Sequence, residues 1–363
     1  MSPGSLKRIR IWKHDGNTRM QPARMCNLSV NRDETILAAA SMYYLQDIKM
    51  ETIAQRLHMS RSSVSRLLKE ARSSGLVNIA LRPTPSHAPE FTHLIAQQFG
   101  VEVYVVPVSD SATTQERLDQ VATATAKMVT DWFDSDMILA IAWGTTLGAV
   151  SQHLTKKPTR GSVIVQLNGG ANNRTSGADY VGNLISRFGE AFDARVQPFP
   201  VPAFFDFAST RRAMWRERSI ARVLEMQRQA DIALFSIGAV TGQVPSHVYS
   251  AGYLEADDIR VLESAGVVGD VCTVFLRADG TYEDLSLNER ASGPTPAELK
   301  HIPRRVCAVA GDNKVIPILA ALRAGIITHL ILDEQTAHGL RLCMTSVHRE
   351  SVHADIVSEL PDR

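Results

Sequence analysis

The chain contains 363 residues, which is enough for about two or three domains. Its hydrophobic content of 44% and charged content of 21% are ordinary for a soluble globular protein. No apolar run approaches the roughly 20 residues that span a bilayer. The first 25 residues also lack the apolar core and cleavage site of a secretory signal. The sequence therefore predicts a cytoplasmic protein and excludes a membrane protein.

The formal net charge of +1 conceals an uneven distribution along the chain. Residues 1–82 carry 14 Lys and Arg against 6 Asp and Glu, whereas the rest of the chain carries 25 against 32. A basic N-terminal part is suited to a phosphate backbone, and an acidic remainder is not. We interpret residues 1–30 as a disordered basic extension, the alternatives being an upstream start and a basic arm that grips DNA.

The cysteines offer no metal site, because they form no CxxC or Cys/His cluster. Their wide spacing is typical of a reduced cytoplasmic protein. The four positions are Cys26, Cys272, Cys307 and Cys343. We therefore expect neither a metal nor a cofactor.

The stretch RSSVSRLL, residues 61–68, predicts an amphipathic helix that begins after the N-cap Ser60. Val64, Leu67, Leu68 and Ala71 recur at helical spacing and would face inward. The outward face would carry two arginines, a lysine and small hydroxyls, which can contact base edges and phosphates. The candidate DNA-binding residues are Ser60, Arg61, Ser62, Ser63, Ser65, Arg66 and Lys69. The alternative is an ordinary solvated helix face.

The preceding residues place this helix in a helix-turn-helix motif. Residues 50–58 predict a shorter helix, and a tight turn with His58 in a left-handed conformation joins the two. Residues 34–46 add an earlier helix, Gly75 ends the second one, and residues 77–81 alternate like the strand of a wing. We expect a winged helix-turn-helix domain over residues 31–82 that binds DNA, the alternative being a helical packing module. A Pro-rich linker over residues 83–90 would follow.

From residue 100 to residue 340, predicted strands alternate with predicted helices. Short apolar runs predict strands, and the segments between them have helical periodicity, including one long helix over 211–229. Residues 267–277 are interpreted as one continuous stretch. The strands are expected over 101–106, 137–142, 162–167, 196–199, 231–237, 305–310 and 329–333. This α/β pattern predicts a doubly wound, mostly parallel sheet in an effector and oligomerisation domain over residues 91–345.

Ligands of such sheets bind beyond the carboxyl ends of the strands, so the residues that follow each strand are the candidates. A glycine with two hydroxyls at a helix start suits an anion, and a lysine in the first turn of a helix opposes the helix dipole. The alternatives are a helix cap without ligand and an exposed surface lysine. The candidate ligand-binding residues are Gly144, Thr145, Thr146, Asn168, Gly169, Gly170, Asp270 and Lys314. Together they indicate a sugar phosphate or polyol.

The segments SRSSVSRLLKEARSSGLVNI, WGTTL, VVGDV and AGDNKVIPILAALRAGIITHLILDEQTA resemble the SorC family of sugar-responsive transcriptional regulators. The resemblance covers residues 32–340. It implies a winged helix-turn-helix head and an effector domain similar to sugar-phosphate isomerases and CoA transferases. It also implies phosphate near Gly144–Thr146 and the Asn168–Gly169 loop, sugar hydroxyls near Asp270 and Lys314, and a dimer or tetramer that rearranges on operator double-stranded DNA.

The chain departs from the family pattern at two positions. Ala310 precedes Gly311 where a double glycine is common, and Asn168 stands where some members that bind sugar phosphates have an arginine. Because a guanidinium is the usual bidentate phosphate partner, a free polyol stays open as the effector.

Three functions are compatible with these features. The first is a DNA-binding regulator of a carbohydrate or polyol catabolic operon, controlled by a bound sugar, polyol or sugar phosphate. The second is a sugar-phosphate isomerase or deaminase with a DNA-binding head, which would need a general base among Asp206, Asp270 and His247. The third is a DNA-bound scaffold without a small ligand. We expect the first, with no catalytic residues.

Overall fold

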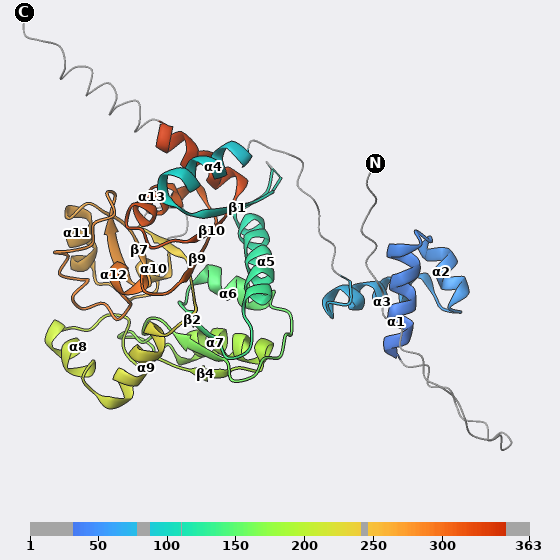
Figure 1. Ribbon diagram of the computed structural model, residues 1–363, viewed down its shortest axis with the longest axis horizontal. Coiled ribbons are helices and arrows are strands. Elements are labelled where there is room, and N and C mark those ends of the chain that lie inside the picture. The colour runs from blue at the N-terminus through green and yellow to red at the C-terminus, as the bar shows by residue number, and fades with distance from the viewer. Residues whose placement is uncertain (1–31, 78–87, 110, 241–245, 346–363) are drawn as a thin grey trace, which may run out of the picture. The chain divides into compact units, whose positions relative to one another are not determined.

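The computed structural model describes residues 32–77, 88–109, 111–240 and 246–345 (Figure 1). The chain forms two compact units, Met1–Ala80 and Leu81–Arg363, which we call the head and the body. The predicted N-terminal extension and most of the predicted wing and linker lie outside the described residues. The last predicted linker positions belong to the first helix of the body, which begins at Ala88.

The head packs its helices around a small apolar core. Its elements are α1 (Arg32–Ala40), which continues as the π-helix η1 (Ser41–Leu45), then α2 (Met50–Arg56) and α3 (Arg61–Ser73). Ile36, Ile53, Val64 and Leu68 are each at most 5% exposed and bring the three α-helices together. The helical spacing of these apolar residues predicted which faces meet. The helices confirm the predicted three-helix arrangement in the described residues.

The turn between α2 and α3 has the predicted geometry. His58 has a φ of 50°, in the left-handed region where a non-glycine residue is uncommon. The Ser60 side chain caps α3, because its Oγ accepts a hydrogen bond from the Ser63 N–H at 3.1 Å. Gly75, with a φ of 76°, follows the end of α3. The turn therefore fixes the position at which α3 begins.

The body is built on a seven-stranded sheet in which every neighbouring pair is parallel. The strand order is β1-β10-β9-β5-β2-β3-β4. The central strands are short apolar runs whose residues are buried on both faces, as parallel sheets require. In this order the bounds are Glu102–Val106, His329–Asp333, Arg304–Val309, Ile232–Phe235, Ile138–Ile141, Val163–Gln166 and Arg195–Gln197.

Helices cover both faces of this sheet, and two apolar clusters separate them from it. In β2, Ala140 belongs to one cluster and Leu139 and Ile141 belong to the other, because alternate residues of a strand face opposite sides. The helices are α4 (Ala88–Phe99), α5 (Thr114–Trp132), α6 (Thr145–Gln152), α7 (Ala178–Phe192), α8 (Ala208–Met214), α9 (Arg218–Arg228), α10 (His247–Ser250), α11 (Ala256–Ser264), α12 (Pro296–Leu299), η2 (Asp312–Lys314), α13 (Val315–Arg323) and a last helix over 334–345.

A second, three-stranded antiparallel sheet was not predicted. It contains β6 (Ile237–Ala239), β7 (Val267–Val271) and β8 (Val274–Arg277) in that order. The prediction of one strand over 231–237 is wrong, because the chain leaves the large sheet after β5 and enters the small one as β6. The continuous reading of 267–277 is also wrong, because the chain reverses at Cys272 and Thr273, whose φ values are 50° and 72°. Neither residue is a glycine, so the turn carried no sequence signal.

The single helix predicted over 211–229 is two helices, α8 and α9, with a break between Met214 and Arg218. Trp215 lies at the break and contacts Phe199 and Phe205, with ring centroids 5.6 Å from each. The Arg211 guanidinium lies over the same indole at 4.7 Å from its centroid. The helix is thus interrupted where Trp215 packs against residues distant in sequence, and helical periodicity alone does not predict such a break.

Candidate functional site

A cavity of about 340 Å³ opens at the carboxyl ends of the central strands. After β2 the chain proceeds through α6 to β3, whereas after the neighbouring β5 it proceeds toward β9 on the other side. The reversal makes the β2/β5 pair the topological switch point, where α/β sheets bind ligands. The volume is at the small end of the roughly 300–1,000 Å³ of ligand pockets. The site therefore fits a small molecule.

Six of the eight predicted ligand-binding residues line this cavity, namely Gly144, Thr145, Thr146, Asn168, Asp270 and Lys314. They are far apart in sequence and come from the segments after β2 and β3, from β7 and from η2. Gly169 and Gly170 are not among its lining residues.

The two glycines instead allow close packing behind the cavity wall. A Cβ on Gly169 would lie 2.3 Å from the Pro202 carbonyl oxygen, and a Cβ on Gly170 would lie 2.7 Å from Val181. The Gly169 carbonyl accepts a hydrogen bond from Trp143 Nε1 at 2.8 Å. Close packing against Pro202 and Val181, and not a ligand, therefore explains why both positions are glycine.

The first residues of α6 line the cavity at a helix start that no side chain caps. Its N-cap is Gly144, with a φ of 147°, and no side chain caps the helix. The Thr146 hydroxyl accepts a hydrogen bond from Ser236 Oγ at 3.1 Å, which ties this turn to the segment after β5. An uncapped helix start has the geometry and the dipole that suit a negatively charged or carbonyl oxygen.

Asp270 is a fully enclosed carboxyl group of the cavity wall. It lies in β7 opposite Gly238 of β6, and a Cβ on that glycine would lie 1.8 Å from Asp270 Oδ1. Its Oδ2 accepts a hydrogen bond from the Thr273 N–H at 3.2 Å, and the buried hydroxyl of Tyr249 interacts with the same carboxyl. Burial raises the pKa of Asp270 to about 6, although the Lys314 ammonium opposes the shift. Such a carboxyl is poised to accept from a ligand hydroxyl.

Lys314 supplies the nearby cationic group. Its Nζ donates to the Ile237 carbonyl at 2.9 Å and to Ser246 Oγ at 2.6 Å. Burial lowers the pKa of Lys314 to about 8, and the Asp270 carboxylate opposes this shift. An ammonium group has three donors, so one is left for a ligand.

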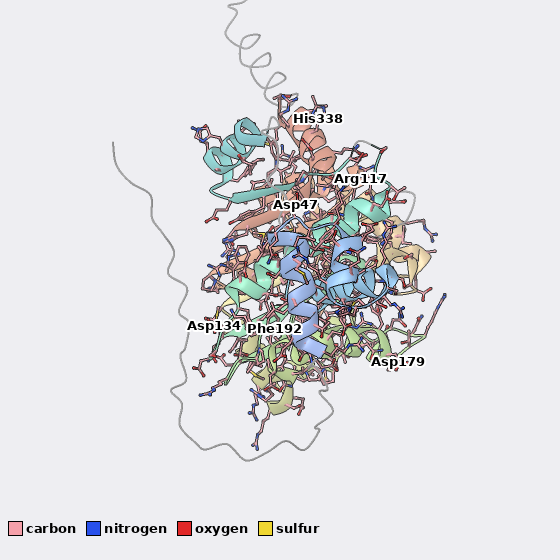
Figure 2. The ribbon with its side chains drawn as sticks, turned by 90° about the vertical axis from the view of Figure 1, so that its right-hand side faces the viewer. Asp47, Arg117, Asp134, Asp179, Phe192 and His338 are labelled. Atoms are coloured by element: carbon pink, nitrogen blue, oxygen red, sulfur yellow. The ribbon has the colours of Figure 1, made fainter. Side chains whose placement is uncertain are left out.

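At the start of α5, Arg117, which Figure 2 labels, pairs with Asp312 of η2 at 3.3 Å. The pair ties this helix to the segment that carries Lys314. Thr114 and Gln115 of the same first turn line the cavity.

Several lining residues escaped prediction. Trp143 stacks on Tyr253 with centroids 4.9 Å apart, and His247 stacks on Tyr180 at 4.8 Å, so aromatic rings flank the polar residues. Burial lowers the pKa of His247. Trp143 could have been found because it directly follows a strand, whereas His247, at the start of α10, was considered only as a general base. The other lining residues are Thr114, Gln115, Leu118, Ala142, Ser236, Ile237, Gly238, Ser246, Val248, Cys272, Thr273, Ala310 and Asn313.

Replacing Gly238 with alanine should disrupt this wall, because the new methyl group would overlap the Asp270 carboxyl. Overpacking of this kind costs about 1–3 kcal/mol of unfolding free energy. Thermal unfolding measures the loss. Gly182→Ala is the matched control, because Gly182 lies in α7 with no atom within 4 Å of an added Cβ, and it should be neutral or stabilising. Equal stability of the two variants would contradict the described contact.

The exposed face of α3 carries the predicted DNA-binding residues. Arg61, Ser62, Ser65, Arg66 and Lys69 are exposed, and Ser60 is exposed at the cap. Ser63 is half-buried and bonds with Ser60. The face contains no carboxylate, but Glu51 of α2 pairs with Arg61 at 3.0 Å. The arrangement agrees with a helix that presents polar and cationic groups outward.

Within the described ranges, no group of three or more His, Cys, Asp or Glu residues could hold a metal ion. No helix of the same part of the chain is long and apolar enough to cross a membrane. Of the three residues considered as a general base, Asp270 and His247 line the cavity, whereas Asp206 is exposed and does not line it.

The chain matches known proteins over most of its length. Residues 85–340 match the family model described as "Putative sugar-binding domain". The deoxyribonucleoside regulator of Bacillus subtilis is 30% identical over 85% of this chain and 97% of its own length. The sorbitol operon regulator of Klebsiella pneumoniae is 26% identical over 83% of this chain and 96% of its own length.

Two solved structures are similar to the fold. A domain of a possible sugar-binding transcriptional regulator from Arthrobacter aurescens is 45% identical, with a TM-score of 0.66, and the match covers 72% of this chain and 99% of that one. The full-length sorbitol operon regulator SorC from Klebsiella pneumoniae is 23% identical, with a TM-score of 0.68 over 85% of this chain and 98% of that one. The second comparison supports the fold alone.

The relatives are transcriptional regulators, so the predicted regulator function holds and the isomerase or deaminase alternative does not. The chain is a DNA-binding transcriptional regulator with a sugar-binding domain. It belongs to the SorC family of sugar-binding transcriptional regulators.

Proposed function

We propose that the cavity at the β2/β5 switch point is the effector site and that it binds a small sugar, polyol or sugar phosphate. The observation that carries this proposal is a buried oxygen without a hydrogen-bond partner among the described residues, Asn168 Oδ1, which lines the same cavity as the buried Asp270 carboxyl. A buried polar atom without a hydrogen bond costs stability, and a ligand hydroxyl would satisfy it.

The charges of the wall suggest how the effector is oriented. Lys314 is the one lysine or arginine among the lining residues, and the Asp270 carboxylate offsets its charge. This end of the cavity thus suits hydroxyl groups more than a phosphate. A phosphate or carbonyl oxygen would instead bind at the uncapped start of α6, at Thr145 and Thr146. Neutral polyols and monophosphates are both compatible with this division.

The head would couple the effector to transcription. A helix-turn-helix protein reads each half-site with its own recognition helix, so operator binding requires at least two copies of the chain. We propose a homodimer or homotetramer on a palindromic operator in the cytoplasm. The effector would bind one conformation of the assembly more tightly and thereby shift the population on DNA. The names of two relatives, a deoxyribonucleoside regulator and a sorbitol operon regulator, support small polyhydroxylated effectors.

Thermal unfolding with a panel of pentoses, hexoses, polyols and their phosphates tests the site. A ligand present at 100 times its Kd stabilises the folded state by about 2.7 kcal/mol. For a domain of this size, the melting temperature should rise by roughly 5–10 °C. Asp270→Asn is the control, because it keeps the shape of the carboxyl but removes its charge. A compound that stabilises both proteins equally binds elsewhere, and a panel without any stabilising compound contradicts the proposal.

A further inference from the structure

One arginine of the α3 face is held by a side chain from another helix. Arg61 is the first residue of α3, and its Nε lies 3.0 Å from Oε1 of Glu51, in the first turn of α2. Both side chains are more than half exposed, at 66% and 59%. An exposed pair of this kind contributes little to folding stability. Stability therefore does not explain why a carboxylate lies beside a DNA-binding face.

The other cations of this face lack such a partner. Arg66 and Lys69 are exposed and have no ion pair within the described part of the chain. The α3 face thus contains two cations without an ion pair in the described residues, which suit phosphates, and one cation that is paired with a carboxylate. The paired arginine lies at the N-terminal end of the helix, the end that contacts base edges in helix-turn-helix proteins.

We propose that Glu51 is a specificity-determining residue that orients Arg61 toward the edge of one guanine in the operator. The ion pair engages the Nε side of the guanidinium, and the two terminal nitrogens remain for guanine O6 and N7. A guanidinium that Glu51 orients in this way does not turn to a phosphate or to another base. The ion pair therefore increases the preference of Arg61 for guanine at one position of the operator. The inference rests on the proposed role of α3 as the reading helix.

Removal of the Glu51 charge has two opposite consequences on DNA. The head gains one unit of net positive charge, so its attraction to any DNA increases. At the same time Arg61 becomes free to adopt several directions, so the preference for guanine at one position decreases. A carboxylate that only weakened DNA binding would produce the first effect without the second.

The experiment uses the full-length chain and operator sites selected from random double-stranded DNA. Dissociation constants are measured for the selected site and for each single base-pair substitution, with the wild type, Glu51→Gln and Glu70→Gln. Glu70→Gln is the matched control, because it removes an equal charge from the other Arg–Glu pair of the head, Arg32–Glu70 at 2.9 Å. Glu51→Gln should reduce guanine discrimination by about tenfold at one position of each half-site. Glu70→Gln should leave every preference unchanged.

Two further variants make the result unambiguous. Glu51→Asp retains the carboxylate and should restore part of the discrimination, whereas a purely structural contact would show no dependence on charge. Arg61→Ala should abolish the same preference. If Glu51→Gln and Glu70→Gln strengthen binding to all sequences alike, Glu51 only repels the DNA phosphates and the inference is wrong. If Arg61→Ala changes no preference at all, the assignment of α3 as the reading helix fails instead.

Discussion

A Lys314→Met variant should bind operator DNA as tightly as the wild type and respond to no effector. Methionine fills a similar volume but has no donor, so the cavity loses its one lysine and the contacts to Ile237 and Ser246. DNA affinity should persist because Lys314 lies in the body and not in the head. The measurement is DNA binding titrated with the compound that gives the largest thermal shift in the wild type. An unaltered titration curve would remove Lys314 from the site.

The pH dependence of stability should also change in this variant, and the sign follows from the pKa of Asp270. Its pKa of about 6 in the folded chain lies above the usual value. The protonated form therefore stabilises the fold at low pH, and this contribution is lost as the pH rises through 6. Without the Lys314 ammonium the pKa should rise further. Relative to the wild type, the variant should be less stable at pH 7.5 than at pH 5.

A double variant, Asp270→Asn with Lys314→Met, separates folding from binding. Asp270 and Lys314 are buried opposite charges that influence each other's pKa. Removing one of two such charges is destabilising, whereas replacing both by neutral groups is often neutral or favourable. The double variant should therefore regain the stability lost by Lys314→Met at pH 7.5 and still ignore the effector. A double variant that responds to the effector would show that these two residues are not the ligand contacts.

Much of the site could be predicted because sheet topology brings the ends of distant strands together. Gly144–Thr146, Asn168 and Lys314 directly follow strands or open helices, and strand prediction alone placed them at one edge. Asp270 reached the cavity by another route, since it lies inside a strand of the small sheet. Asp270 was predicted as a ligand-binding residue and lines the cavity, but the antiparallel sheet that positions it was not predicted.

The parts that could not be predicted depend on tertiary contacts without a local signature. Ser246 contacts Lys314 from 68 residues away, and no periodicity marks such a contact. The turn at Cys272 and Thr273 has positive φ without glycine, so the usual signal of a hairpin is missing. In contrast, α3 and its cap were predictable because capping, helical spacing and the tight turn are local properties of residues 50–75.

Replacing Arg66 with alanine should weaken operator binding by about 1–3 kcal/mol. Arg66 is exposed on α3 and has no ion pair in the described part of the chain, so it is available to DNA. Binding measured at several salt concentrations identifies its partner. If Arg66 contacts a phosphate, the salt dependence should decrease by about one counterion for all sequences. If it contacts a base, the loss should be confined to the operator.

Arg222→Ala, which removes an exposed arginine from α9 of the body, is the charge control and should change neither the affinity nor its salt dependence. Wild-type binding by Arg66→Ala at every salt concentration would mean that the outward face of α3 does not read DNA.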